Sequence, residues 1–255
     1  MKFQLLKTPK YILILVGFTV VCLTILGIRN TIVGTDFFDF LKSNLLSGVV
    51  PFVIAVGLQI FYRHINNFLF IVISMIWLLF YPNAPYMISD LIHPHQEVMD
   101  TKYSSLIVYD TLIVFSIAML SVFYGFVSLK IMFNLFRTRY GKKTAHGMFA
   151  ISLILSCVGF YMGRELVSEI KIGNGYLYSS EMFLEPGYII KTVWNALYPI
   201  GENINAYYMM FLFGFIQFQL LVMMKDVGDI EQAEIVTKVH DNFHSNQEES
   251  VNIES

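Results

Sequence analysis

The stretch Tyr81-Pro-Asn-Ala-Pro-Tyr-Met-Ile-Ser-Asp-Leu-Ile-His93 decides how this chain is interpreted, because it places two prolines and two ionisable groups within a strongly apolar region. Hydrocarbon cannot satisfy free backbone N–H and C=O groups, so a broken helix at membrane depth is tolerated only inside protein or beside a water-filled cavity. Ionisable side chains at that depth are costly and mark a candidate site. The stretch therefore indicates where a function would be located.

The composition around this stretch is that of a membrane protein. Hydrophobic residues make up 56% of the 255 positions and charged residues 14%, whereas a soluble domain carries about 25% charged residues. The net charge of −2 gives no indication of nucleic-acid binding, so the lipid bilayer is the expected partner. No motif identifies a protein partner or a cofactor. Cys22 and Cys157 lie in apolar runs and are expected to be small buried residues rather than a disulfide or zinc ligands.

Six apolar windows are long enough, or nearly so, to cross about 30 Å of hydrocarbon as helices. They predict an all-α, polytopic transmembrane bundle in which the proline-broken segment follows the third span. A seventh candidate, Tyr188–Ile200, is short and contains Lys191, which favours an interfacial helix over a span. The six windows are Tyr11–Ile28, Leu45–Tyr62, Phe68–Tyr81, Ser105–Leu129, Ala145–Gly163 and Asn205–Met224.

The windows place residues 1–224 in one transmembrane domain. The first window follows three lysines but has no small-residue cleavage site before Arg29, which favours an uncleaved signal anchor over a signal peptide. Residues 225–255 contain eight acidic residues against two lysines. That composition predicts a solvated, disordered tail.

Basic residues predict the orientation, because cytoplasmic segments carry an excess of lysine and arginine. With six spans and a cytoplasmic N-terminus, the inner segments hold eleven basic residues and the outer segments six. The cluster Arg137–Lys143 dominates this asymmetry. Both termini are therefore expected in the cytoplasm, and the proline-broken segment is expected near the outer leaflet.

The prolines predict the local structure of the broken segment. Pro82 lacks a donor and Pro85 disfavours a helical Ala84, so the third helix is expected to end near Tyr81. Asn83 is then expected to act as the N-cap of a new short helix, because asparagine is a favoured cap and proline is tolerated in a first turn.

A short α-helix starting at Asn83 would bring three polar side chains to one face. Tyr86, Asp90 and His93 stand at i, i+4 and i+7, and Pro94 is expected to end the helix. A carboxylate one turn from an imidazole suits general-base or metal-ligand chemistry. The alternative is structural: Asn83 only caps, while Asp90 and His93 face water in the headgroup layer.

The same region contains a loose run of metal-ligand types, Asp90-x2-His93-x-His95-x-Glu97. Asp90, His93 and His95 are candidate ligands on this pattern. The spacing matches no zinc motif, and a structural role for His95 in the loop is the alternative interpretation.

Asp110 is the second candidate site residue, because it is the sole charge between Lys102 and Lys130. A carboxylate in such a window becomes neutral or finds a cation. Arg164, at the outer end of the fifth span, is the expected partner, and a purely structural ion pair is the alternative.

The predicted topology brings further residues to the outer side. Glu165 and Glu202 are expected there, so Asp90, His93, Asp110, Arg164 and Glu202 are candidates for convergence although they are far apart in sequence. A stripe of small residues, which permits close helix approach, comprises Ser152, Ser156, Gly159 and Gly163.

Three stretches resemble one known family. They are Trp77–His93, the pair Tyr109-Asp110, and Gly159-Phe-Tyr-Met-Gly-Arg164. Together they are similar to a family of uncharacterised bacterial integral membrane proteins, domain of unknown function thirteen sixty-one, and the likeness covers most of residues 10–225. The family pattern continues after the arginine with Asn-Ser-Trp-Asp, where this chain has Glu165–Ile170. The resemblance implies a location in the bacterial cytoplasmic membrane and no activity.

Three functions from different classes remain open. The protein is a scaffold or accessory protein whose charges hold helices together, a membrane-embedded enzyme acting on an envelope or lipid-linked substrate, or a small transporter. An enzyme would use Asp90 and His93 as acid/base groups or metal ligands, and a transporter would gate a polar path with Asp110 and Arg164. No Walker loop, G-x-S-x-G, H-E-x-x-H or G-x-G-x-x-G motif is present.

Overall fold

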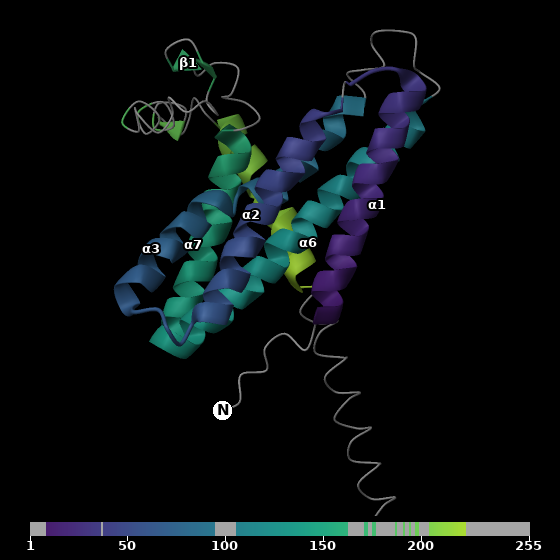
Figure 1. Cartoon of the computed structure of the whole chain (residues 1–255). Helices are drawn as coiled ribbons and strands as arrows, with labels where there is room; N and C mark the ends of the chain where they lie inside the picture. The colour runs from purple at the N-terminus through teal and green to yellow at the C-terminus, as the bar shows by residue number, and fades with distance from the viewer. Residues whose placement is uncertain are drawn as a thin grey trace, which may run out of the picture. The chain divides into compact units, whose positions relative to one another are not determined.

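A computed structural model describes residues 9–36, 38–94, 106–162, 171–172, 175–176, 187, 191, 194, 197–198 and 204–222 (Figure 1). The chain divides into two compact units, Met1–Gly214 and Phe215–Ser255. The helices and the candidate site discussed below belong to the first unit, except for the C-terminal half of one helix.

The described part of the chain is helical apart from one short ladder. Strands β1 (Lys171–Ile172) and β2 (Gly175–Tyr176) pair antiparallel. The helices are α1 (Pro9–Val33), α2 (Phe40–Phe61), α3 (Asn67–Phe80), α4 (Asn83–Tyr86), the 3₁₀ helix η1 (Met87–Ile92), α6 (Ile107–Tyr140) and α7 (Lys142–Tyr161), followed by a helix over Ile204–Val222.

Six helical segments among the described residues are long and apolar enough to cross a membrane, which confirms the predicted fold class. The third of them runs over Asn67–Ile92 and includes α3, α4 and η1. The third window therefore reaches spanning length only by including the proline-broken segment. The protein is a multi-pass membrane protein.

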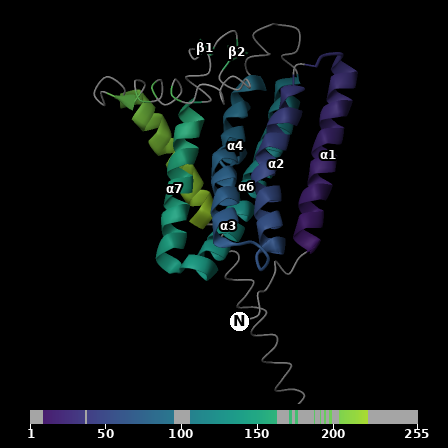
Figure 2. The same cartoon turned by 60° about the vertical axis from the view of Figure 1, so that its left-hand side comes forward.

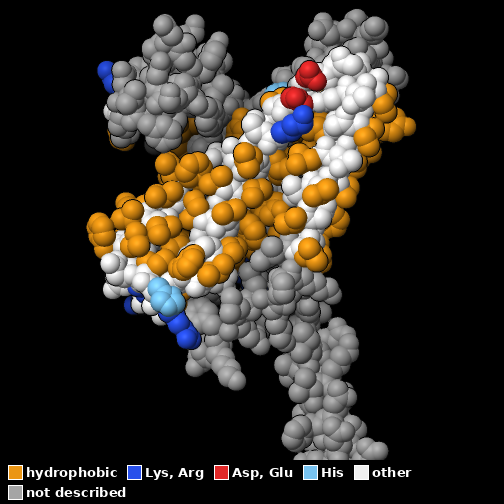
Figure 3. All heavy atoms as spheres, in the orientation of Figure 1, with side chains coloured by type: hydrophobic (Ala, Val, Ile, Leu, Met, Phe, Trp, Pro, Cys, Tyr) orange, Lys and Arg blue, Asp and Glu red, His pale blue; other side chains and the backbone are white. Residues whose placement is uncertain are grey.

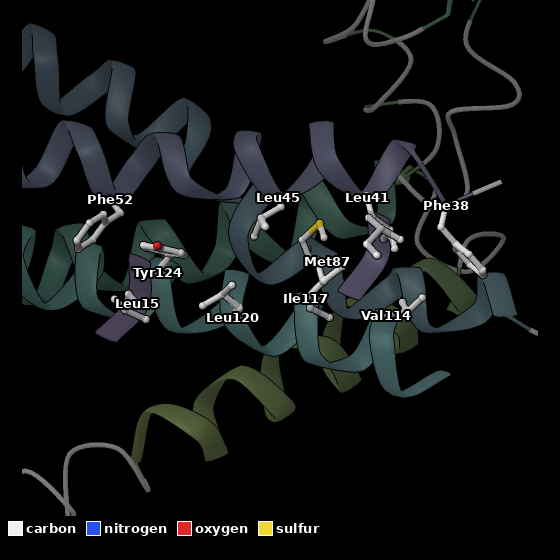
Figure 4. Close-up of a cluster of buried hydrophobic side chains, with 12 residues drawn as sticks. Leu15, Phe38, Leu41, Leu45, Phe52, Met87, Val114, Ile117, Leu120 and Tyr124 are labelled. Carbon is white, nitrogen blue, oxygen red and sulfur yellow. The ribbon is translucent and has the colours of Figure 1, made fainter. Parts of the chain in front are cut away.

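Helix α6 is the centre of the first unit and is the most buried of the six spans. It contacts α1, α2, α4, η1 and α7, and the five long helices of this unit stand side by side (Figure 2). The main apolar cluster is formed by side chains from α1, α2, η1, α6 and the turn before α2 (Figure 4). Its members are Leu15, Leu26, Phe38, Leu41, Leu45, Phe52, Met87, Val114, Ile117, Ala118, Leu120 and Tyr124.

The outward faces of the helices are also apolar. Leu13, Ile32, Phe68 and Met75 are among the large hydrophobic side chains that are more than half exposed, and Figure 3 shows hydrophobic side chains over the middle of the visible face. A surface of this kind fits contact with lipid tails. Because lipid is as apolar as a core leucine, close packing and polar contacts must hold the helices together.

Two helices continue past the C-terminal ends of their predicted windows. Helix α1 continues past Ile28 to Val33, and α6 continues past Leu129 to Tyr140. Arg29 does not end α1 because a buried carboxylate neutralises it, as described below. Arg137 and Arg139 suit the last turn of α6, where the negative end of the helix dipole favours cations.

Candidate functional site

The proline-broken segment is buried inside protein. Tyr81, Ala84 and Met87 have no exposed surface. The backbone carbonyl oxygen of Ala84 accepts a hydrogen bond of 3.0 Å from Ser121 Oγ on α6. The break thus meets the condition that membrane depth imposes on irregular backbone, since a neighbouring helix supplies a donor for it.

Two glycines let neighbouring helices approach this segment. A Cβ atom added at Gly125 of α6 would lie 2.8 Å from Ala84 Cβ, and one added at Gly159 of α7 would lie 2.9 Å from Pro82 Cβ. Both distances are shorter than van der Waals contact. Gly159 of the small-residue stripe therefore packs against the proline-broken segment, and the stripe residues Ser152 and Ser156 are fully buried.

The structure corrects the predicted role of Asn83. Helix α3 does end at Phe80, as expected, but the N-cap position of α4 is Pro82, and no side-chain cap hydrogen bond forms. The backbone stays in the right-handed helical region at Tyr81 (φ −53°, ψ −42°) and Pro82 (φ −56°, ψ −27°). A capping residue needs a non-helical backbone, so Asn83 is the first helical residue instead.

The predicted shared face of Tyr86, Asp90 and His93 is only partly formed. From Met87 the chain is a 3₁₀ helix, which has three residues per turn and aligns residues at i and i+3. Asp90 and His93 stay aligned, whereas the Tyr86 ring lies 6.4 Å from the Phe160 ring of α7. The α-helical spacing assumed from the sequence was wrong for this segment.

Asp90 links η1 to α2. Its side chain is 2% exposed, and its Oδ2 atom accepts a hydrogen bond of 3.0 Å from Asn44 Nδ2. The other oxygen, Oδ1, lies 3.6 Å from Nε2 of His93, whose side chain is 24% exposed. The Phe40 ring meets the imidazole edge-on at 4.7 Å. Asp90 and His93 therefore form a carboxylate–imidazole pair that is buried on the carboxylate side and partly open on the imidazole side.

Asp110 links α6 to α1 through Arg29, a partner that the sequence analysis did not propose. Arg29 Nε donates to Asp110 Oδ1 at 3.0 Å, and Arg29 Nη2 donates to Oδ2 at 2.9 Å. Both side chains are nearly fully buried. Two parallel hydrogen bonds between a guanidinium and a carboxylate form a strong, directional contact. Arg164, the partner expected from the sequence, lies outside the described residues.

The turn between α1 and α2 completes the surroundings of Arg29. Its Nη1 atom donates to Thr35 Oγ1 at 2.8 Å, and its guanidinium lies 4.6 Å from the centre of the Phe38 ring. Nearby, Asp39 Oδ1 accepts from Asn30 Nδ2 at 2.6 Å and from Lys42 Nζ at 2.7 Å. The contacts form two sets, Arg29 with Asp110 and Asn44 with Asp90 and His93, and we call the five residues together the polar cluster.

Sequence reasoning missed two members of this cluster, Arg29 and Asn44. Both stand just outside the predicted windows, where a polar residue marks the end of a span. The signal that was available is positional. Arg29 directly follows the first window, at the predicted outer end of that span, and Asp110 lies near the outer end of the fourth. Asn44 directly precedes the second window, at the same predicted end as Asp90.

The remaining candidate residues lie outside the described part of the chain. They are His95, Glu97, Gly163, Glu165 and Glu202. Within the described residues, no group of three histidine, cysteine or acidic side chains is arranged to hold a metal ion. Cys22 and Cys157 are half-buried free thiols.

A cavity of about 250 Å³ opens between α1 and α6. It is lined by Cys22, Ile25, Tyr109, Leu112, Ile113 and Ser116. None of these is a carboxylate, an imidazole or a permanent cation. The cavity is therefore suited to an apolar group and does not expose the polar cluster.

The comparisons with known proteins identify a family and no activity. The family model described as a protein of unknown function (DUF1361) matches residues 43–220, well over half of the chain. No curated protein and no solved structure matches. The matched range includes Asn44, Asp90, His93 and Asp110 but begins after Arg29. The chain belongs to the DUF1361 family.

Proposed function

We propose that this protein is an accessory or scaffold protein of the bacterial cytoplasmic membrane, in which the polar cluster near the outer leaflet fixes the arrangement of the helices. The observation that carries the proposal is that both buried carboxylates are held by side chains of other helices. Arg29 of α1 holds Asp110 of α6, and Asn44 of α2 holds Asp90 of η1. Groups held in this way stabilise a fold and do not need a substrate.

The distribution of charge supports the proposed orientation. Among the described residues, the acidic ones (Asp36, Asp39, Asp90 and Asp110) belong to the α1–α2 turn, η1 and the start of α6. The α2–α3 turn and the ends of α6 and α7 that flank Gly141, at the other end of the helices, contain basic residues and no acidic ones. Basic ends favour the cytoplasm, so we propose that both termini lie on the cytoplasmic side.

Cysteine labelling tests this orientation. In a variant with Cys22 and Cys157 replaced by alanine, we expect Asp36→Cys to react with a membrane-impermeant maleimide in intact cells. Thr138→Cys should react only after the cells are opened. Both positions are exposed, so accessibility differs only by the side of the membrane. Labelling of Thr138→Cys in intact cells would show that the orientation is inverted.

A second candidate function rests on the open side of the carboxylate–imidazole pair. A buried carboxylate that orients a partly exposed imidazole is the arrangement of many general bases. Asp90 and His93 have this geometry, with 3.6 Å between the nearest oxygen and nitrogen atoms. It supports a membrane-embedded enzyme that acts on an envelope or lipid-linked substrate.

Two substitutions at Asp90 separate the scaffold from the enzyme. Asp90→Asn keeps an oxygen that accepts from Asn44, so a scaffold should keep both its melting temperature and its ability to complement a deletion strain. Asp90→Leu removes the acceptor of the half-buried Asn44 amide, and losing such a hydrogen bond costs about 0.5–1.5 kcal/mol. A scaffold should therefore lose stability and complementation together. The measurements are thermal unfolding in detergent and growth of the deletion strain.

The double variant Asn44→Leu/Asp90→Leu is the matched control, because it removes both polar partners and should regain part of the stability. An enzyme gives a different pattern: Asp90→Asn and His93→Gln fold normally and fail to complement at normal membrane levels. That pattern would replace the scaffold proposal with the enzymatic one.

A further inference from the structure

The end of the helices opposite the polar cluster gathers basic side chains and, among the described residues, no acidic ones. Arg63 and His64 follow α2, Arg137 lies in the last turn of α6, and Lys142 and Lys143 begin α7. All five side chains are exposed. Figure 3 shows basic and histidine side chains at the lower end of the visible face, whereas the acidic side chains near the upper end lie beside a basic one.

Arg139 holds the two turns of this end together. Its Nη2 atom donates to the carbonyl oxygen of Ile65 at 2.6 Å, and its Nε atom donates to Asn67 Oδ1 at 2.7 Å. Its guanidinium also lies 4.7 Å from the centre of the Phe70 ring. The α2–α3 turn is thereby fixed beside the C-terminal end of α6, so the basic residues of both turns belong to one surface.

Four permanent cations of this surface have no partner within the described part of the chain. The side chains of Arg63, Arg137, Lys142 and Lys143 make no hydrogen bond or ion pair there. We call these four residues the basic surface. Lys142 and Lys143 also occupy the first turn of α7, where the helix dipole disfavours cations. Mutual repulsion and the dipole both favour binding of an anion that the described residues do not supply.

The spacing of charges puts the basic surface at a hydrocarbon boundary. The 20 residues between Lys42 and Arg63 contain no lysine, arginine or acidic residue, and the same holds for the 20 residues between Lys143 and Arg164. Twenty helical residues rise about 30 Å, which is the thickness of the hydrocarbon core. Arg63 and Lys143 thus lie at the depth where lipid phosphates begin.

From this arrangement we propose that the basic surface binds the phosphodiester headgroups of anionic phospholipids. The headgroup supplies the missing negative charge at the depth where the cations lie. Each lysine or arginine near an anionic membrane surface changes affinity about five-fold. The proposed lipid binding does not involve the polar cluster at the other end, so its test is separate from the tests of the proposed function.

Lipid retention in native mass spectrometry tests this proposal. The full-length protein is reconstituted in nanodiscs of equal parts phosphatidylcholine and phosphatidylglycerol, and the retained lipids are counted. We expect phosphatidylglycerol to exceed phosphatidylcholine about five-fold among the most tightly retained lipids. The variant Arg137→Gln/Lys142→Gln/Lys143→Gln should lose most of this preference. Equal retention of both lipids by the unmodified protein would overturn the proposal.

Two controls place the site and its chemistry. Lys42→Gln removes an exposed cation at the opposite end and should leave the phosphatidylglycerol preference unchanged. Lys142→Arg/Lys143→Arg keeps the positive charge and should also retain the phosphatidylglycerol preference. A preference that survives the triple substitution contradicts the assignment to this surface. Displacement of phosphatidylglycerol by excess inorganic phosphate would also overturn the proposal, because it would show a phosphate site in place of a lipid site.

Salt dependence provides a test that does not require a variant to fold. Raising the salt concentration from 0.1 M to 1 M shortens the Debye length from about 10 Å to about 3 Å. The phosphatidylglycerol preference of the unmodified protein should fall accordingly. A preference that is insensitive to salt would be inconsistent with binding by exposed cations.

Discussion

Removing either partner of the Arg29–Asp110 pair is expected to lower the free energy of unfolding by about 3–5 kcal/mol, and removing both should restore part of that loss. Each single substitution, Arg29→Gln or Asp110→Asn, leaves a buried group without its charged partner. The two side chains meet through two hydrogen bonds of 3.0 and 2.9 Å in a buried setting. Thermal unfolding of the purified variants in detergent measures the effect.

The exposed pair Asp39–Lys42 is the matched control for this prediction. Its separation of 2.7 Å is shorter than that of the buried pair, but both side chains are 46% exposed. Exposed ion pairs contribute about 0–1 kcal/mol because water and salt screen them. Lys42→Gln should therefore change stability little. Strictly additive losses for Arg29→Gln and Asp110→Asn would show that the buried pair contributes no coupling energy.

The number and type of spans could be predicted from the sequence because they depend on composition alone. Twenty apolar residues cross the hydrocarbon whatever their neighbours are. The location of the helix break was equally predictable, because Pro82 and Pro85 restrict the backbone locally. The structure agrees on both points, with α3 ending at Phe80 and six segments of spanning character within the described residues.

The form of the helix after the break could not be predicted, because it depends on tertiary contacts. The sequence Met87–Ile92 has no local feature that requires a 3₁₀ helix. There Asp90 contacts Asn44 of α2, whereas Tyr86 lies beside Phe160 of α7. An α-helix would place the side chains of Tyr86 and Asp90 on one face. The tighter 3₁₀ helix turns them toward different neighbouring helices.

The partner of Asp110 was missed for a related reason. Sequence reasoning identified that a buried carboxylate needs a cation, and the span directions narrowed the choice to one side of the membrane. Arg29 and Arg164 both satisfy those conditions. The packing of α1 against α6 brings Arg29 to Asp110, and Arg164 lies outside the described residues. The need of Asp110 for a cationic partner could thus be predicted from the sequence, whereas the identity of that partner required the three-dimensional arrangement.

The interior of this membrane protein depends on close approach more than on apolar burial, since lipid is as apolar as its core. The contact between Gly159 and Pro82 is one place where that dependence is testable. Helix α7 offers a matched pair of glycines: a Cβ atom at Gly159 would collide with Pro82, whereas one at Gly147 would have no neighbour within 4 Å.

Gly159→Leu is expected to destabilise the protein by about 1–3 kcal/mol, because overpacking a close contact forces side chains and backbone to move. The displaced element is the proline-broken segment, so the Ser121–Ala84 hydrogen bond on its other side should weaken too. Gly147→Leu makes the same chemical change in open space and should leave stability within about 0.5 kcal/mol or raise it slightly. Thermal unfolding of both variants in one detergent gives the comparison. Equal effects at the two positions would mean that lost glycine flexibility, and not contact with Pro82, determines the stability of α7.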